Sequence, residues 1–76
     1  MARKTNGAAL RSIRKLAGIP QNKLAAQIGI RAATLSQVES GRYGLHPAKL
    51  RRAADILGVP INAISTVTPE PEEVAS

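Results

Sequence analysis

Residues 21–39 of the chain read QNKLAAQIGIRAATLSQVE, and the organisation of the whole sequence follows from this stretch. Its apolar residues have the spacing of two short helical faces on either side of Gly29: first Leu24, Ala25 and Ile28, then Leu35 and Val38. Glycine reaches the left-handed backbone conformation without a Cβ clash, so Gly29 is expected to end the first helix. Two helices joined by about three or four residues form a helix-turn-helix.

The sequence before this stretch predicts a further helix over residues 7–17, capped by Thr5 or Asn6 and ended by Gly18. Leu16 is expected to widen its apolar face, whose main residues are Leu10, Ile13 and Ala17. The first helix of the helix-turn-helix then begins at Pro20 or Gln21 and ends at Ile28, because the fixed φ of a proline suits a helix start.

The second helix of the motif covers residues 32–40, and Pro47 opens a fourth helix over residues 47–57. The apolar face of this last helix consists of Leu50, Ala53, Ala54 and Leu57. Residues 60–64 offer a short fifth helix. With one aromatic residue in the chain, the core must be aliphatic. The predicted fold class is therefore all-α, a compact bundle of four to five short helices.

The segment after the fourth helix holds more apolar residues than one helical turn normally buries in a monomer. These residues are Val59, Ile61 and Ile64. They are the candidate surface of a homodimer.

Charge is unevenly distributed along the chain. All 11 Lys and Arg residues lie within residues 3–52, whereas three of the 5 acidic residues lie within residues 70–73. Residues 1–64 carry eleven cations against two acids, a net charge of +9, and residues 65–76 carry −3. The chain therefore divides into a basic flexible arm (1–6), a folded domain (7–64) and a disordered acidic tail (65–76). Such a polycation suits a nucleic acid, although charge alone is equally consistent with a solvated basic surface.

The composition excludes several classes of function. The chain has no cysteine, so it has no thiolate metal site. Its one histidine is His46, and the part expected to fold has no paired carboxylates for acid and base catalysis. Neither an enzyme nor a cofactor is expected. No apolar run approaches the roughly 18 residues of a membrane span, and no signal peptide is visible, so a soluble protein inside the cell is expected.

Four short motifs follow one another along the chain: Gln21 with Leu24-Ala25, Gly29-Ile30, Glu39-x-Gly41-Arg42, and Leu57-Gly58-Val59-Pro60. With these motifs, residues 10–57 resemble the phage repressor (Cro and C1) type of helix-turn-helix DNA-binding domain. The resemblance implies the lambda repressor-like fold and a sequence-specific transcriptional regulator, by default a repressor, in the cytoplasm of a bacterial cell or a phage-infected host. It implies double-stranded operator DNA as the partner, bound by a homodimer with the third helix in the major groove and without a small-molecule ligand.

The resemblance also implies roles for individual residues. The outward face of the third helix is small, polar and uncharged, which suits close approach to base edges, and its base-reading candidates are Ala32, Ala33, Thr34, Ser36 and Gln37. The candidates for phosphate contact are Gln21, Asn22, Lys23, Arg31, Ser40, Arg42 and Tyr43. An arginine of the first helix commonly pairs in this family with the glutamate that ends the third, and the matching residues are Arg14 and Glu39.

Two features depart from the family pattern. Arg31 stands where a small hydroxyl residue usually caps the third helix, and Pro20 stands where the second helix often has a capping side chain. Ala32 and Ala33 offer only apolar contacts, for example to a thymine methyl group. The alternative function is a protein-interaction module of the same fold, antitoxin-like or regulator-binding, with weak nonspecific affinity for DNA. The net charge of +9 favours DNA over this alternative.

Overall fold

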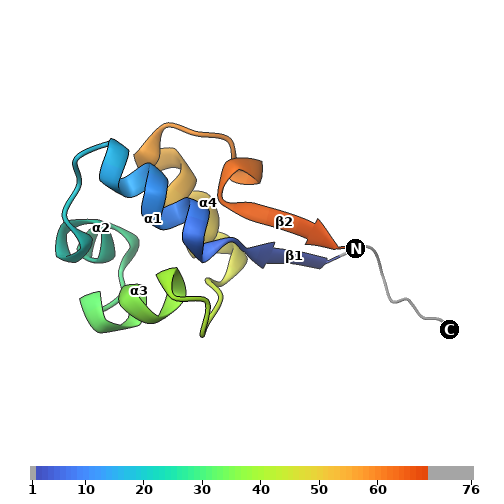
Figure 1. Cartoon of the computed structure of the whole chain (residues 1–76), viewed down its shortest axis with the longest axis horizontal. Helices are drawn as coiled ribbons and strands as arrows, with labels where there is room; N and C mark the ends of the chain where they lie inside the picture. The colour runs from blue at the N-terminus through green and yellow to red at the C-terminus, as the bar shows by residue number, and fades with distance from the viewer. Residues whose placement is uncertain (1, 69–76) are drawn as a thin grey trace, which may run out of the picture.

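The computed structural model describes residues 2–68, and its four α-helices form the bundle that the sequence predicts (Figure 1). In chain order the elements are β1 (Ala2–Thr5), α1 (Gly7–Leu16), α2 (Gln21–Ile28), α3 (Ala32–Glu39), α4 (Pro47–Leu57), the 3₁₀ helix η1 (Ile61–Ala63) and β2 (Ser65–Thr68). β1 and β2 form a two-stranded ribbon at one end of the helical body. Within residues 2–68, no helix combines the length and the hydrophobicity that crossing a membrane requires.

The helix boundaries follow from local capping signals. The NH of Ala9 donates to Asn6 Oδ1 at 3.1 Å, so Asn6 is the N-cap of α1. His46 caps α4 in the same way, because the NH of Ala48 donates to His46 Nδ1 at 3.2 Å, and Pro47 takes the first helical position. α2 and α3 have no side-chain cap, as the proline and the arginine at their N-cap positions predict.

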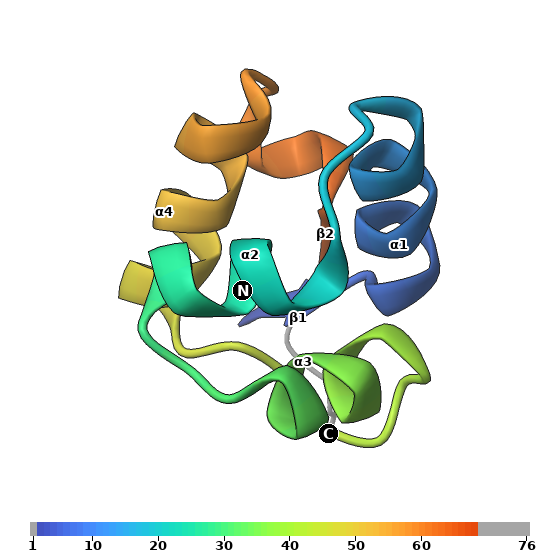
Figure 2. The ribbon, with the colours of Figure 1, turned by 90° about the vertical axis from the view of Figure 1, so that its left-hand side faces the viewer.

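A tight turn joins α2 to α3 and completes the helix-turn-helix. Gly29 has a φ of 86°, in the left-handed region where an L side chain would be strained. The NH of Ile30 donates to the carbonyl of Ala25 at 2.9 Å, which closes the end of α2 in the manner of a Schellman motif. The Ile30 side chain packs against the core, so apolar contacts also stabilise the turn. Figure 2 shows the result, with α2 between α1 and α4 and α3 crossing beside them.

The core is aliphatic and draws on all four helices. Its buried residues are Leu10, Leu24, Ala25, Ile28, Leu35, Val38, Leu50, Ala53, Ala54 and Ile64. Leu16 was expected among them, but its side chain is 88% exposed, and Ala17 is exposed as well. The buried face of α1 ends instead at Arg14, and Leu16 lies about 200° around the helix from it. The predicted apolar stripe of α1 is therefore wrong at its C-terminal end, because a buried arginine takes the core position.

Ile64, a candidate for the dimer surface, belongs to this core, and 0% of its surface is exposed. The NH of Asn6 donates to the carbonyl of Ile64 at 2.9 Å, which draws the segment after η1 against the start of α1. Val59 and Ile61 are half-buried and also pack against the core. The assignment of Ile64 to a dimer surface is therefore wrong, since the side chain is used inside its own chain.

The ribbon differs from the expected flexible arm and disordered tail. β1 and β2 pair antiparallel, from Thr5 opposite Ser65 to Ala2 opposite Thr68. The base of the ribbon is anchored to the body, because the NH of Leu45 donates to Thr5 Oγ1 at 2.8 Å and Ser65 Oγ donates to the carbonyl of Ile61 at 2.6 Å. The expectation is thus wrong for residues 2–5 and 65–68, whereas Met1 and residues 69–76 lie outside the described residues.

α1 and α3 meet through backbone atoms at Gly7. A Cβ atom on Gly7 would lie 2.1 Å from the carbonyl oxygen of Val38 and 3.0 Å from that of Glu39. Only glycine permits this approach, which places the start of α1 against the end of α3.

Gly7→Ala is therefore expected to destabilise the domain by roughly 1–3 kcal/mol, because overpacking forces the backbone to shift. Thermal unfolding followed by circular dichroism should show a fall in Tm of about 4–8 °C for each kcal/mol. Gly44→Ala is the matched control, since a Cβ on Gly44 meets only the Thr5 side chain, 3.4 Å from Oγ1. An unchanged Tm for Gly7→Ala would show that α1 can move away from α3 without loss.

Candidate nucleic-acid interface

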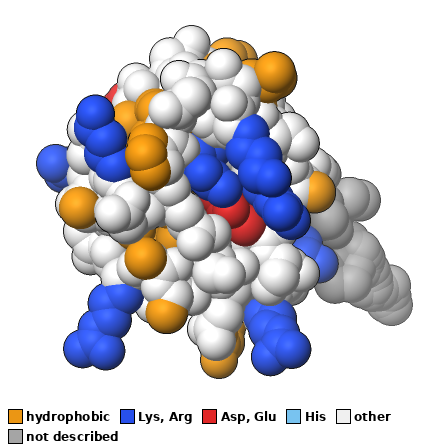
Figure 3. All heavy atoms as spheres, turned by 60° about the vertical axis from the view of Figure 1, so that its left-hand side comes forward, with side chains coloured by type: hydrophobic (Ala, Val, Ile, Leu, Met, Phe, Trp, Pro, Cys, Tyr) orange, Lys and Arg blue, Asp and Glu red, His pale blue; other side chains and the backbone are white. Residues whose placement is uncertain are grey.

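One face of the molecule carries α3 and a hollow beside it. The hollow lies between α1, α2 and α3, has a volume of about 350 Å³, and is lined by Arg11, Arg14, Gln21, Ser36, Glu39 and Ser40. Figure 3 shows Lys and Arg side chains around this face and a small acidic area between them. Ser36 and Ser40 are exposed residues of α3 and its C-cap, so the hollow opens next to the predicted base-reading helix.

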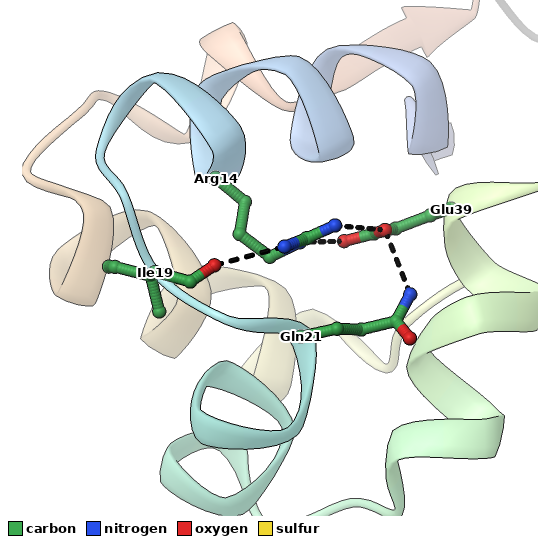
Figure 4. Close-up of polar contacts among 4 residues, drawn as sticks. All are labelled: Arg14, Ile19, Gln21 and Glu39. Atoms are coloured by element: carbon green, nitrogen blue, oxygen red, sulfur yellow. Dashed lines mark hydrogen bonds and ion pairs between the residues drawn. The ribbon is translucent and has the colours of Figure 1, made fainter.

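A buried ion pair joins α1 to the end of α3 across this hollow (Figure 4). Arg14 Nε lies 2.7 Å from Glu39 Oε2, and Arg14 Nη2 donates to Glu39 Oε1 at 3.1 Å. Arg14 Nη1 also donates to the carbonyl of Ile19 at 2.9 Å, in the loop before α2. Gln21 Nε2 donates to Glu39 Oε1 at 3.1 Å. The carboxylate of Glu39 therefore accepts from donors on both α1 and α2.

The pair is largely removed from water, with the side chains of Arg14 and Glu39 10% and 3% exposed. A two-point contact between guanidinium and carboxylate fixes their relative orientation as well as their distance. Breaking such a pair leaves a buried charge without a partner, which is strongly destabilising. These are the two residues that the family resemblance pairs, and their contact holds α3 in place against α1.

The exposed face of α3 is small, polar and uncharged. Ala33, Ser36 and Gln37 are exposed, whereas Thr34 and Ala32 are half-buried and Ala32 packs against the core. Leu35 and Val38 point inward, as the sequence predicts. The structure thus places three of the five base-reading candidates fully on the outer surface of α3.

Residues predicted to contact phosphates lie at both ends of α3. Arg31 precedes the helix and Arg42 and Tyr43 follow it, and all three are exposed. Asn22 and Lys23 are exposed in the first turn of α2, where the positive end of the helix dipole adds to their attraction for an anion. The arrangement gives a neutral central face with donors and cations on either side.

Two of the phosphate candidates already have partners within the chain. Ser40 Oγ donates to the carbonyl of Gln37 at 2.9 Å, so its only proton is used. Gln21 Nε2 donates one proton to Glu39, which leaves the second amide proton for an external acceptor. The sequence gives no sign of either contact, because both depend on how the helices pack.

Arg11 is a residue that the sequence analysis did not single out. It is exposed and lines the hollow together with Ser36 and Ser40. Its position three residues before Arg14 places both arginines on one side of α1. The spacing of three residues between Arg11 and Arg14, together with the pairing of Arg14 to Glu39, is the sequence feature that points to Arg11 as a residue of the hollow.

Two cations of α4 contact backbone carbonyls at the C-terminal end of α2. Arg52 Nε donates to the carbonyl of Gln27 at 2.9 Å. Lys49 Nζ lies 3.4 Å from the carbonyl oxygen of Ile28 and 3.5 Å from that of Gly29. The last carbonyls of a helix lack partners within it and carry the negative end of its dipole, so these side chains stabilise the end of α2.

Comparison with known proteins relates the chain to transcriptional regulators. A family model described as helix-turn-helix matches residues 10–64. A Bacillus subtilis (strain 168) protein, described as the uncharacterized HTH-type transcriptional regulator RghRB, is 34% identical over 73 residues. That match covers 90% of this chain and 52% of RghRB, so the chain spans about half the length of this relative.

Solved structures of similar fold include a gene regulator and a controller protein. The clp gene regulator ClgR from Corynebacterium glutamicum superimposes with a TM-score of 0.71 and 32% identity, over 74% of this chain and 60% of that chain. The restriction-modification controller protein C.AhdI from Aeromonas hydrophila gives a TM-score of 0.69 and 24% identity, over 75% of this chain and 86% of that chain. At that identity, the likeness to C.AhdI concerns the fold alone.

The ion pair leads to a stability prediction. Glu39→Ala and Arg14→Ala should each lower the free energy of unfolding by about 3–5 kcal/mol, because each leaves a buried charge unpaired. The double variant should lose much less than the sum of the two. Asp55→Ala is the control, since Asp55 is exposed on α4 and should change stability by no more than about 0.5 kcal/mol. Additive losses in denaturant unfolding would mean that the two side chains do not stabilise each other.

Proposed function

The chain belongs to the helix-turn-helix family of Cro/C1-type transcriptional regulators, and on that premise we propose that it binds double-stranded operator DNA sequence-specifically through α3. The family consists of DNA-binding regulators, which are not enzymes, so the prediction that this domain is not an enzyme is confirmed. The predicted lambda repressor-like fold is confirmed by the same matches. The proposed mode of action is repression, in which the bound protein excludes polymerase from an overlapping site.

The exposed face of α3 is the observation that carries this proposal. Ala33 and Ser36 are short enough to let the helix lie close to base edges in the major groove, and no acid on this face repels the phosphates. Gln37 both donates and accepts, which suits the paired donor and acceptor of an adenine. Thr34 and Ala33 can meet thymine methyl groups. In this arrangement α3 reads the sequence.

The flanking residues hold the domain on the duplex. We assign phosphate contacts to Lys23, Arg31 and Arg42, with Asn22 and Tyr43 as neutral donors beside them. Gln21 can add its second amide proton. We also assign a phosphate contact to Arg11, because it is exposed at the hollow that opens beside α3. Cations at such positions displace condensed counterions and carry no sequence information themselves.

One short helix reads only a few base pairs, so two copies are proposed to bind inverted half-sites about 10 base pairs apart. Binding selection from random duplexes, followed by sequencing, tests both the specificity and the symmetry of the site. A selected motif with an inverted repeat supports this proposal. A selection that enriches no motif would contradict sequence-specific binding.

A second candidate is a protein-interaction module of the same fold. The observation that favours it is Leu16, a large apolar side chain that is 88% exposed on α1, away from α3. Equal and weak affinity for every duplex, together with loss of a protein partner in Leu16→Ser, would support this candidate over DNA recognition.

Two substitutions distinguish base recognition by α3 from phosphate contacts that do not depend on sequence. Gln37→Ala should lose roughly 1–3 kcal/mol on the selected site and relax the preference at one base position. Arg42→Ala should weaken binding to every sequence alike and reduce the salt slope by about one unit. Competition assays against single-base changes of the site, at several salt concentrations, measure both effects. If Gln37→Ala keeps the full base preference, α3 does not read DNA in the proposed orientation.

The proposed phosphate contact of Arg11 is tested by substitution, with Lys15 on the same helix as the control. Arg11→Ala should lower the affinity for all duplexes and reduce the salt slope by about one unit, as expected for one phosphate contact. Lys15→Ala removes the same charge from an exposed position of α1 that does not line the hollow. Its salt slope should therefore stay close to that of the wild type. Equal slopes for the two variants would argue against a contact from Arg11.

A further inference from the structure

We propose that Asn6 is a site of spontaneous deamidation, and that the fold controls this reaction by holding the start of α1 in place. Asn6 precedes Gly7, and an asparagine followed by a glycine is the pair in which a protein loses a side-chain amide most readily. The inference goes beyond the proposed function, because it concerns a covalent modification and holds whether or not the chain binds DNA.

The reaction needs no enzyme and no reactant other than water. The backbone nitrogen of Gly7 attacks Cγ of Asn6 and loses its proton, while the bond from Cγ to Nδ2 breaks and ammonia leaves. Water then opens the resulting cyclic imide at one of its two carbonyls, which gives either aspartate or isoaspartate. Glycine favours the attack because it has no Cβ atom that obstructs its nitrogen.

The conformation of Asn6 prevents this attack in the folded chain. Its φ and ψ are −96° and 90°, and tetrahedral geometry at Cα then puts the Gly7 nitrogen nearly opposite Cβ across the Cα–C bond. Ring closure requires both atoms on the same side of that bond. The side chain is also engaged, because Asn6 Oδ1 accepts from the NH of Ala9 at 3.1 Å. Asn6 must therefore rotate about its Cα–C bond before it can react.

Packing opposes that rotation. The carbonyl of Asn6 accepts from the NH of Leu10 at 3.0 Å, and rotation turns this carbonyl away from the helix. Gly7 is buried so close to α3 that a Cβ atom on it would lie 2.1 Å from the carbonyl oxygen of Val38. The NH of Asn6 is held as well, since it donates to the carbonyl of Ile64 at 2.9 Å. The reaction thus proceeds only from molecules in which the start of α1 has opened.

The two products differ in whether the start of α1 can close again. Aspartate keeps the side-chain oxygen that accepts from Ala9, and its negative charge suits the first turn of a helix. Isoaspartate carries the main chain through Cβ and Cγ, so the backbone gains an atom before Gly7 and the capping oxygen becomes part of a peptide bond. Gly7 has no room for this shift against Val38 and Glu39. Isoaspartate therefore keeps α1 from packing correctly on α3.

Peptide mapping by mass spectrometry, during storage of the whole chain in mildly alkaline buffer, measures the rate at each asparagine. In the chain unfolded by guanidinium chloride, Asn6 should react before Asn22 and Asn62, because these precede Lys23 and Ala63. In the folded chain, the rate at Asn6 should fall at least about tenfold. Equal rates in the folded and unfolded chains would overturn control by the fold. An unfolded chain in which Asn6 reacts no faster than Asn22 would overturn the site itself.

A variant of the ion pair tests whether opening sets the rate. Glu39→Ala removes the contact of α3 with Arg14, so it should raise the rate at Asn6 severalfold in native buffer. Asp55→Ala is the matched control, since it removes an exposed acid of α4 and should leave the rate unchanged. The same rate in both variants would contradict opening as the controlling step.

The products are compared directly by chemical synthesis of the whole chain with isoaspartate at residue 6, alongside the variant Asn6→Asp. Asn6→Asp should match or exceed the Tm of the wild type, because the cap is retained. The isoaspartate form should melt at least about 4 °C lower. An isoaspartate form with the Tm of the wild type would refute its effect on α1. No DNA is present in these experiments, so their outcomes are independent of the DNA-binding tests.

Discussion

The position of α3 depends on the contact between the guanidinium of Arg14 and the carboxylate of Glu39. This contact has two effects at the candidate interface. It ties the end of α3 to α1 and, through Gln21, to the start of α2, so the three helices present one rigid face. It also neutralises a carboxylate at the end of α3, the helix that we propose faces DNA, where an unpaired negative charge would repel phosphates. The close approach at Gly7 supports the same junction from the backbone side.

The cations of the domain divide into those that hold the fold and those that face outward. Arg14 is used by Glu39, and Arg52 and Lys49 are used by the last carbonyls of α2. The net charge of +9 is therefore larger than the number of phosphate contacts that we propose. The cations assigned to such contacts are fewer, and all of them are exposed: Arg11, Lys23, Arg31 and Arg42. A measured salt dependence should be compared with this smaller set.

Local signals made most of the helical fold predictable from the sequence, because Asn6, Gly29 and Pro47 each act on neighbouring residues only. The errors arise where distant parts of the chain meet. Periodicity assigns a charged residue to the surface, yet Arg14 takes a core position because Glu39, 25 residues away, neutralises it. The ribbon pairs opposite ends of the chain, for which no local pattern exists. The place of Arg11 in the hollow likewise depends on how α1 packs on α3.

The hydrogen bond between Asn6 and Ile64 brings the two ends of the helical domain side by side, at the base of the ribbon. A domain whose ends lie together can be inserted into a loop of another protein without stretching its host, and it can be circularly permuted with a short linker. New termini opened in the exposed residues between α3 and α4 would leave the helix-turn-helix continuous. Because β1 and β2 pair next to each other on either side of the helices, the helical body can be transferred to another protein as one unit.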